Sequence, residues 1–305
     1  MDIVRTDTVF MGLADSPFKV AIASGKGGTG KTLVSTSLAA YIGEFESVLL
    51  ADLDVEEPND AIFIKGDLKD IQPQFRFVPD WDITRCDMCG MCEELCNFNA
   101  LAALDGMVVV YEKLCHSCYA CSEMCPKEAL PMKKSHIGDI SYFKMGMVTL
   151  LEGRLNVNEE QPVGLIKLVQ ERSVKCDQEA RFHIFDSPPG TSCSMIASIE
   201  ECDQLLLVTE PTPFGLNDLV LAIQAARLLD KPVAVVVNRY GSGNAMVEEY
   251  CKENNIDVVA RIPYDMTIAE RYSKGGLMLD KHCFRSVIAG IFNYLERKEA
   301  NRRRR

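Results

Sequence analysis

Five short runs of apolar residues recur along the chain, and each is bounded by polar or turn residues. A run that is apolar at every position, rather than at alternate positions, is typical of a parallel strand buried on both faces. We therefore predict buried strands at 18–24, 47–54, 181–186, 204–210 and 232–238.

Between these runs and after the last of them, apolar residues recur at helical spacing. The last such stretch has one apolar face, formed by residues 284, 287, 288, 291, 292 and 295. Because strands and helices alternate, we predict an α/β fold built on a doubly wound, mainly parallel sheet. We expect the last helix to cover this sheet; the alternative is a membrane-surface helix with the basic end 301–305. The other predicted helices are 33–44, 216–229 and 244–255.

A cysteine-rich repeat interrupts this alternation. Its eight cysteines fall between Cys86 and Cys125, and the second half follows the first at a spacing of 29 residues. The flanking letters also align, with CNFNAL at 96–101 against CPKEAL at 125–130. A repeat of this kind marks a duplicated unit. We therefore predict one domain formed by 1–79 and 136–305, with a small α+β domain inserted at 80–135.

Each half of the repeat reads C-x2-C-x2-C-x3-C, the ligand spacing of 4Fe-4S clusters. At this spacing three thiolates hold one cluster, and the fourth cysteine reaches the other cluster. Two zinc sites are the alternative, because zinc also accepts four thiolates. The predicted ligand sets are Cys86, Cys89, Cys92 and Cys125 for one cluster, and Cys115, Cys118, Cys121 and Cys96 for the other.

The insertion resembles a bacterial two-cluster ferredoxin. It departs from that family at Asn97, which follows Cys96 where the family has a proline, as at Pro126. Proline lacks a backbone N–H, so we expect Asn97 to change the hydrogen bonding near one cluster without removing a ligand. His116, which lies between two ligands, is expected to be exposed.

A glycine-rich loop lies between the first predicted strand and the first predicted helix. Gly25-x4-Gly30-Lys31-Thr32 fits the Walker A pattern in its required context. Lys31 should reach the β- and γ-phosphates and Thr32 should bind magnesium, which predicts ATP and Mg²⁺ as ligands. The backbone N–H groups of the loop should surround phosphate oxygens at the helix N-terminus, and they come from Gly25, Gly27, Gly28, Thr29 and Gly30.

This loop contains a second lysine, Lys26, just after its first glycine. KGGTGKT resembles the deviant Walker A loop of the MinD/ParA/Mrp superfamily. That resemblance implies an ATP-dependent homodimer in which Lys26 reaches the partner's nucleotide. A cation supplied in this way would stabilise the negative charge of the transition state and couple hydrolysis to dimerisation. The alternative is that Lys26 is simply an exposed loop cation.

The same resemblance implies roles for residues outside the loop. ADLDVEEPN resembles switch I, which gives Asp54 the role of orienting the attacking water and Asp52 that of supporting magnesium; helix capping is the alternative. FDSPPGT resembles switch II, with Asp186 linked to magnesium and Gly190 near the γ-phosphate. Two further positions are implied for the adenine base, namely Asn238 at the end of PVAVVVN and Pro263 in ARIPYD.

Composition narrows the class of partner. The net charge of −11 argues against general nucleic-acid binding, which needs a basic face. No run approaches 18 apolar residues, so we predict no membrane span. The chain has thirteen cysteines, and its first twenty residues contain no apolar signal core, which predicts metal binding in the cytoplasm rather than disulfides.

For Cys193, just past Asp186, we expect a buried thiol; the alternative is a cluster ligand at the dimer interface.

Together these features predict an ATP-hydrolysing homodimer tied to two 4Fe-4S clusters. The implied function is ATP-gated electron transfer or metallocofactor maturation, with a redox or metallocofactor protein as partner. The alternatives are a MinD/ParA-like positioning ATPase with sensory or structural clusters, and a ferredoxin whose nucleotide site is vestigial.

Overall fold

The computed structural model describes residues 16–241 and 245–304. Our prediction for the first twenty residues therefore lies largely outside the described residues, as do the first position of the predicted helix 244–255 and the last residue of the basic end 301–305.

One nine-stranded sheet forms the centre of the protein, in the order β11-β10-β9-β1-β8-β2-β7-β6-β3. The strands from β11 to β7 are parallel, whereas β6 and β3 run antiparallel at one edge. This confirms the doubly wound, mainly parallel sheet, and every predicted strand is present within two residues of its expected ends. The parallel strands are β1 (Phe18–Ala23), β2 (Val48–Asp52), β7 (Val148–Leu155), β8 (Phe182–Asp186), β9 (Gln204–Thr209), β10 (Val233–Tyr240) and β11 (Asp257–Pro263).

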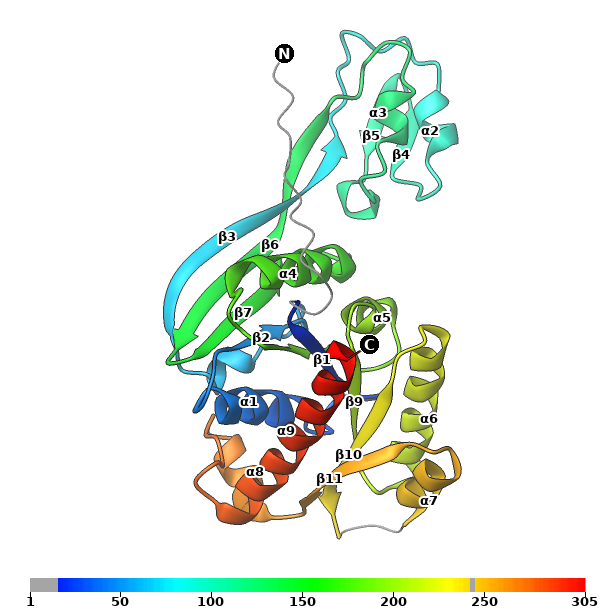
Figure 1. The fold of residues 1–305 in the computed structure, drawn as a ribbon. Helices are drawn as coiled ribbons and strands as arrows, with labels where there is room; N and C mark the ends of the chain where they lie inside the picture. Colours follow the sequence, from blue (N-terminus) through cyan, green and yellow to red (C-terminus); the bar gives the residue numbers. More distant parts are fainter. Residues whose placement is uncertain (1–15, 242–244, 305) are drawn as a thin grey trace.

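Helices cover both faces of the sheet and form a three-layer body (Figure 1). One face packs against α1 (Lys31–Ile42), α8 (Met266–Tyr272) and α9 (His282–Arg303). The other face packs against α4 (Pro162–Cys176), α5 (Cys193–Ile199), α6 (Pro213–Leu228) and α7 (Met246–Glu253).

The apolar face of α9 lies in the core, as predicted. Phe284, Ile288, Ile291 and Leu295 are buried against the sheet and α1. The helix therefore uses its apolar stripe to cover the sheet, and no helix among the described residues is long and apolar enough to cross a membrane.

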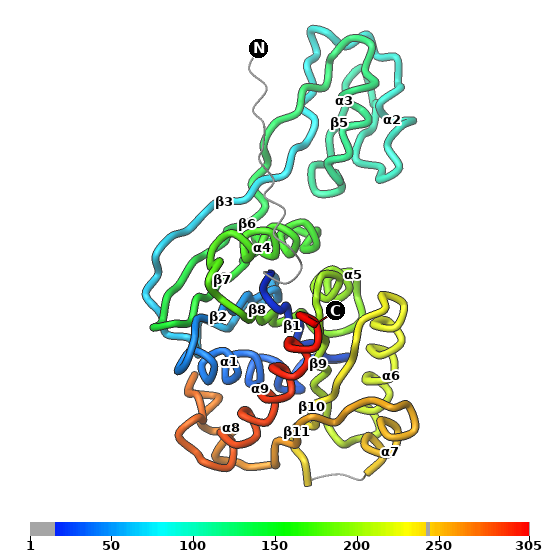
Figure 2. Tube along the Cα trace, in the orientation of Figure 1, coloured from blue at the N-terminus to red at the C-terminus, as the bar shows by residue number. Residues whose placement is uncertain are grey.

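A long two-stranded ribbon extends from the body and was not predicted from the sequence. It consists of β3 (Asp67–Pro79) and β6 (Met132–Met145), which pair from Asp67–Lys144 to Pro79–Met132. Residues 80–131, which we call the cysteine module, sit at its far end, away from the three-layer body (Figures 1 and 2). The module contains α2 (Met91–Leu95), α3 (Ala120–Glu123) and the hairpin β4 (Leu101–Leu104) and β5 (Met107–Val110), with a short 3-10 turn at Glu112–Leu114.

The sequence repeat is also visible in the backbone of the cysteine module. Three pairs of left-handed residues recur at the repeat spacing, namely Met88 and Ser117, Gly90 and Tyr119, and Asn99 and Glu128. Left-handed conformations are uncommon outside glycine, so three coincident pairs indicate that both halves wind their cysteines in the same way.

Candidate functional site

The carboxyl ends of three neighbouring strands meet at one edge of the sheet. The loop 24–30 follows β1, Asp186 ends β8 and Asp52 ends β2, and β8 lies between β1 and β2. In open α/β sheets, ligands bind in the crevice at such a switch in strand order. The topology therefore brings the predicted phosphate loop and both predicted acidic switches together.

Two glycines of the phosphate loop are required by close packing. A Cβ atom on Gly25 would lie 2.2 Å from the backbone oxygen of Asp218. Gly30 has a φ of 99°, and a Cβ atom there would lie 2.3 Å from the side-chain nitrogen of Asn238. That nitrogen donates a hydrogen bond to the backbone oxygen of Thr29 at 2.7 Å. Asn238 thus braces the loop, and its contact with adenine stays a prediction.

Lys31 and Thr32 begin α1 beneath the loop. Lys31 is buried, and the Thr32 hydroxyl donates to Asp186 at 2.7 Å. Burial raises the pKa of Asp186, whereas the Lys31 ammonium and the Thr32 hydroxyl lower it. The nucleotide loop and switch II are thereby linked through the residues predicted to bind magnesium. The link continues at Gly190, which has a φ of 89° and whose N–H donates to the Ser24 carbonyl at 3.0 Å.

Asp52 organises the loop that follows β2. Its side chain accepts hydrogen bonds from the backbone N–H groups of Asp54 at 3.1 Å, Asn59 at 2.8 Å and Asp60 at 3.0 Å. Asp54 itself is half-buried, and burial raises its pKa to about 6 while Lys31 opposes the rise. A carboxylate with a pKa near neutrality suits the task of orienting a water molecule.

Two further acids at this edge were missed in the sequence. Glu152 lies on β7 directly opposite Asp52 and is buried. Asp60 begins the short 3-10 turn Asp60–Ile62 and is fully buried. Both carboxylate oxygens of Asp60 and the Oδ1 atom of Asp186 have no hydrogen-bond partner among the described residues. Unpartnered buried carboxylates favour a cation in this place.

A second ion-pair group lies beside the phosphate loop. The buried Glu210, at the end of β9, pairs with Lys26 at 3.8 Å and with Arg239 at 2.9 Å. The side chain of Lys26 is 35% exposed. In the single subunit Lys26 is therefore held by its own chain but can still be reached by a partner, so its action across a dimer stays a prediction.

A pocket of about 680 Å³, counted with its open mouth, adjoins the phosphate loop. This size suits a small-molecule ligand. Its lining includes Gly28, Gly30 and Asn238 on one side and Pro263 on the other, so it brings together the loop and both predicted adenine positions. Tyr272, which the sequence analysis missed, closes one wall; burial and the nearby Asp186 raise its pKa to about 12.

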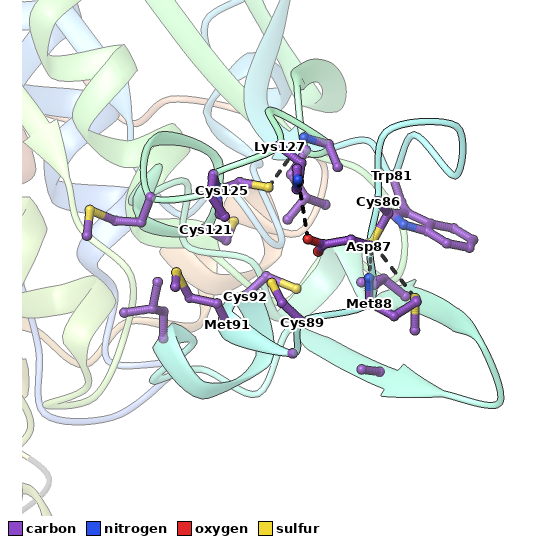
Figure 3. A pocket seen from close by; sticks show the side chains of 18 residues that line it. Trp81, Cys86, Asp87, Met88, Cys89, Met91, Cys92, Cys121, Cys125 and Lys127 are labelled. Carbon is purple, nitrogen blue, oxygen red and sulfur yellow. Dashed lines mark hydrogen bonds and ion pairs between the residues drawn. The ribbon is translucent and has the colours of Figure 1, made fainter.

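The cysteine module contains two cavities that match the predicted ligand sets. The first is lined by Cys86, Cys89, Cys92 and Cys125, together with Cys121, which borders both cavities. Figure 3 shows side chains from both halves of the repeat arranged around it. The second cavity is lined by Cys96, Cys115, Cys118 and Cys121.

Backbone N–H groups point at the cysteine sulfurs in an equivalent way in both halves. The Ala100 N–H donates to Cys96 Sγ at 3.2 Å, and the Ala129 N–H donates to Cys125 Sγ at 3.3 Å. Hydrogen bonds of this kind stabilise negative charge on thiolate sulfur. The two cysteines that cross to the opposite cluster in the predicted ligand scheme therefore each accept an equivalent main-chain hydrogen bond.

The cysteines that raise one another's pKa also belong to the same predicted ligand set. Burial raises the pKa of Cys92, and Cys86 and Cys125 raise it further. Burial likewise raises the pKa of Cys121 to about 11, with further contributions from Cys115, Cys118 and Cys96. Four crowded thiols cannot all ionise without a cationic group among them.

A site for a single metal ion requires its ligands to lie closer together than the ligands of a cluster do. Across the described ranges, no three His, Cys, Asp or Glu side chains are placed to hold one ion. Thiolates bind one zinc ion at about 2.3 Å each and so lie close together. A cubane is larger than one ion, and its four thiolates lie farther apart around it.

Cys193 corrects one prediction. We expected a buried thiol at a helix start, but Cys193 is exposed at the first position of α5. The reason is that the next two residues, Ser194 and Met195, take the buried side of this first turn.

His116 is exposed as predicted, and its ring stacks on Phe98 with centroids 3.9 Å apart.

Comparison with known families agrees with this geometry. The model of the CobQ/CobB/MinD/ParA nucleotide binding domain matches residues 20–278. The chain belongs to this family. An uncharacterised protein of Methanocaldococcus jannaschii is similar to this CobQ/CobB/MinD/ParA protein. The two chains are 30% identical over 279 residues, which cover 90% of this chain and 97% of the relative. An iron-sulfur cluster carrier protein of Pyrococcus horikoshii is 22% identical over 284 residues, or 85% of this chain and 78% of that protein.

Solved structures share the fold. The cell division ATPase MinD of Pyrococcus furiosus superposes with a TM-score of 0.56 at 19% identity, covering 92% of this chain and 98% of that one. MinD of Aquifex aeolicus gives a TM-score of 0.55 at 17% identity, covering 92% and 97%. The CobQ/CobB/MinD/ParA protein described here therefore has the mainly parallel P-loop fold of MinD.

Proposed function

We propose that this protein is an ATP-hydrolysing homodimer whose cysteine module holds two 4Fe-4S clusters, and that it acts in ATP-gated electron transfer or metallocofactor maturation. The observation that supports this most directly is the match between two cavities and the two ligand sets predicted from sequence. The partner would be a redox or metallocofactor protein in the cytoplasm. When bound, each cluster would supply one-electron redox chemistry.

The nucleotide end of the proposal rests on residues around the phosphate loop. The loop N–H groups and Lys31 would bind the phosphates of ATP, and Thr32, Asp186 and Asp60 would hold magnesium. Asp54 would orient the attacking water. Lys26, released from Glu210, would reach the partner subunit's nucleotide and stabilise the charge that develops during transfer.

The cluster end rests on the cysteine module. Cys86, Cys89, Cys92 and Cys125 would hold one cluster, and Cys115, Cys118, Cys121 and Cys96 the other. The backbone N–H groups of Ala100 and Ala129 would donate hydrogen bonds to the sulfurs of the two crossing cysteines and stabilise the negative charge on them.

The connection between the two ends supports coupling. The loop after β2 carries Asp54 and Asp60 and leads, within a few residues, into β3. β3 then runs 13 residues to the cysteine module. A rearrangement of this loop on nucleotide binding would therefore act at one end of the strand whose other end supports the clusters.

Cluster binding is tested by anaerobic reconstitution of the full chain with iron and sulfide. We expect four iron and four sulfide per cluster, with half the total lost in Cys92→Ala and in Cys118→Ala. Cys283→Ala, which removes an exposed cysteine outside the module, should keep the full content. Wild-type protein that takes up no iron and sulfide would refute the cluster proposal.

Coupling is tested separately by comparing the ATPase rate and the nucleotide-dependent dimerisation of oxidised and dithionite-reduced protein without oxygen. We expect the two redox states to differ in at least one of these properties. Equal rates and equal dimerisation in protein with full clusters would show that the two ends work independently.

A further inference from the structure

A buried ion pair joins the ribbon to the three-layer body. Arg76 on β3 and Glu159 on the loop between β7 and α4 approach to 2.9 Å, and their side chains are only 9% and 8% exposed. The Arg76 Nε atom is also buried and has no hydrogen-bond acceptor among the described residues. The guanidinium group therefore pairs directly with Glu159, interacts electrostatically with Glu112, and retains an unused donor at Nε.

Arg76 lies on the ribbon face that packs against the cysteine module. Residues two apart on a strand share a face, so Arg76 points to the same side as Val78. Val78 packs against Ala100 and Cys115, and Cys115 lines the second cavity. The ribbon thus places the Arg76 guanidinium on the face that contacts a cysteine of the module.

Several contacts hold this region in register. Ser135 lies opposite Arg76 on β6, and its hydroxyl donates to Glu112 at 3.0 Å. The Ser117 hydroxyl donates to the backbone oxygen of Phe77 at 2.6 Å. The segment that carries Cys115 is therefore fixed on the ribbon face that carries Arg76.

Glu159 belongs to the body, on a loop whose start is hydrogen-bonded to the loop after β2. Its loop begins after Leu155, whose N–H donates to the Val55 carbonyl at 2.8 Å, one residue after Asp54. The same loop contacts the module, because the Gln161 side chain donates to the Lys113 carbonyl at 2.7 Å. A movement of this connection would therefore change the distance between Glu159 and Arg76.

We propose that Arg76 raises the reduction potential of the cluster held by Cys96, Cys115, Cys118 and Cys121, and that Glu159 limits this effect by compensating its charge. The inference rests on the proposed function, because it requires a cluster in the second cavity. Reduction adds one electron and thus one negative charge to the cluster, and a nearby cation stabilises the more negative form.

The experiment is a redox titration of the anaerobically reconstituted full chain with dithionite as reductant, followed by EPR. Arg76→Gln should lower the ratio of reduced to oxidised second cluster at a fixed potential by about tenfold, or about 59 mV for one electron. A unit charge at about 10 Å with an effective dielectric constant of about 20 produces an effect of this size. Glu159→Gln should shift the potential in the opposite direction, and Arg76→Lys should stay close to wild type.

Opposite shifts from the two partners are the decisive result, because a purely structural ion pair would move the potential in the same direction when either side is lost. Arg181→Gln is the matched control, since it removes an arginine that pairs with Glu296 at 2.9 Å in the body. Shifts of equal sign, or none, in protein with full iron content would overturn the inference. Absence of iron from wild-type protein would instead count against the proposed function.

Discussion

Asp60 offers a sharp test of the nucleotide site, because its substitution should affect stability and function in opposite directions. The change is Asp60→Asn, which keeps the size and shape of the side chain and removes one negative charge. In the structure Asp60 is fully buried beside Asp52 and Asp186, and these two carboxylates raise its pKa in addition to the larger effect of burial.

The expected gain in stability follows from the unpartnered oxygens. Both oxygens of Asp60 and the Oδ1 atom of Asp186 accept no hydrogen bond among the described residues. An amide at position 60 would donate to an acceptor and remove the repulsion. Because an unsatisfied buried polar group costs about 1–3 kcal/mol, we expect the free energy of unfolding to rise by about that amount without magnesium and nucleotide.

The expected loss is in magnesium-dependent nucleotide binding. Residues that support a metal site typically contribute about 10–100-fold to metal affinity. We therefore expect Asp60→Asn to raise the Mg²⁺ concentration needed for half-maximal binding of ADP by about tenfold. Urea unfolding followed by circular dichroism in EDTA measures the stability, and titration with a fluorescent ADP analogue measures the magnesium requirement.

Asp67→Asn is the charge-matched control, because the side chain of Asp67 is 84% exposed on β3. It should change the free energy of unfolding by less than about 0.5 kcal/mol and leave the magnesium requirement unchanged. The reasoning is refuted if Asp60→Asn lowers stability and binds magnesium nucleotide like wild type, since Asp60 would then be a structural acid.

Three further predictions concern other residues. Lys31→Ala should abolish ATP binding, whereas Lys26→Ala should bind ATP but lose nucleotide-dependent dimerisation in light scattering; unchanged dimerisation of Lys26→Ala would make Lys26 an ordinary loop cation. Glu210→Gln should lower the protein concentration needed for dimerisation with ATP, because it weakens the contact that holds Lys26 at 3.8 Å within its own subunit, and an unchanged requirement would show that this contact does not restrain Lys26. Burial lowers the pKa of His183 from 6.5 to about 4, so the unfolded state binds its proton first as the pH falls; relative to His183→Gln, wild type should lose about 3 kcal/mol of stability between pH 6.5 and 4 in urea unfolding, and an equal pH dependence of the two proteins would refute this.

The predicted elements that proved correct are those with a strong local pattern. The strands at 181–186 and 204–210 each contain a short, mainly apolar run bounded by polar residues, and they became β8 and β9 with almost the same ends. β3 and β6 carry polar residues on an exposed face and pair only with each other and with β7, so their apolar pattern is weak. The pairing of β3 with β6 joins residues more than fifty positions apart, and no local signal in the sequence specifies it.

The same distinction applies to the candidate site. The phosphate loop and the spacing of the eight cysteines lie within short stretches, because phosphate and cluster ligation require several groups from one turn of backbone. Asp60 and Glu152 carry no motif of their own. They join the magnesium edge because β2, β7 and β8 lie side by side in the sheet.

The sequence by itself therefore determined the chemistry that this protein carries, namely a phosphate loop with two lysines and two sets of four cysteines. Only the tertiary structure decided which charges surround that chemistry. The pairing of Arg76 with Glu159, 83 positions apart, arises where the loop between β7 and α4 meets the ribbon. The physical reason is that ligation depends on residue spacing along the chain, whereas electrostatic environment depends on distance in space, which only the packed sheet and ribbon establish.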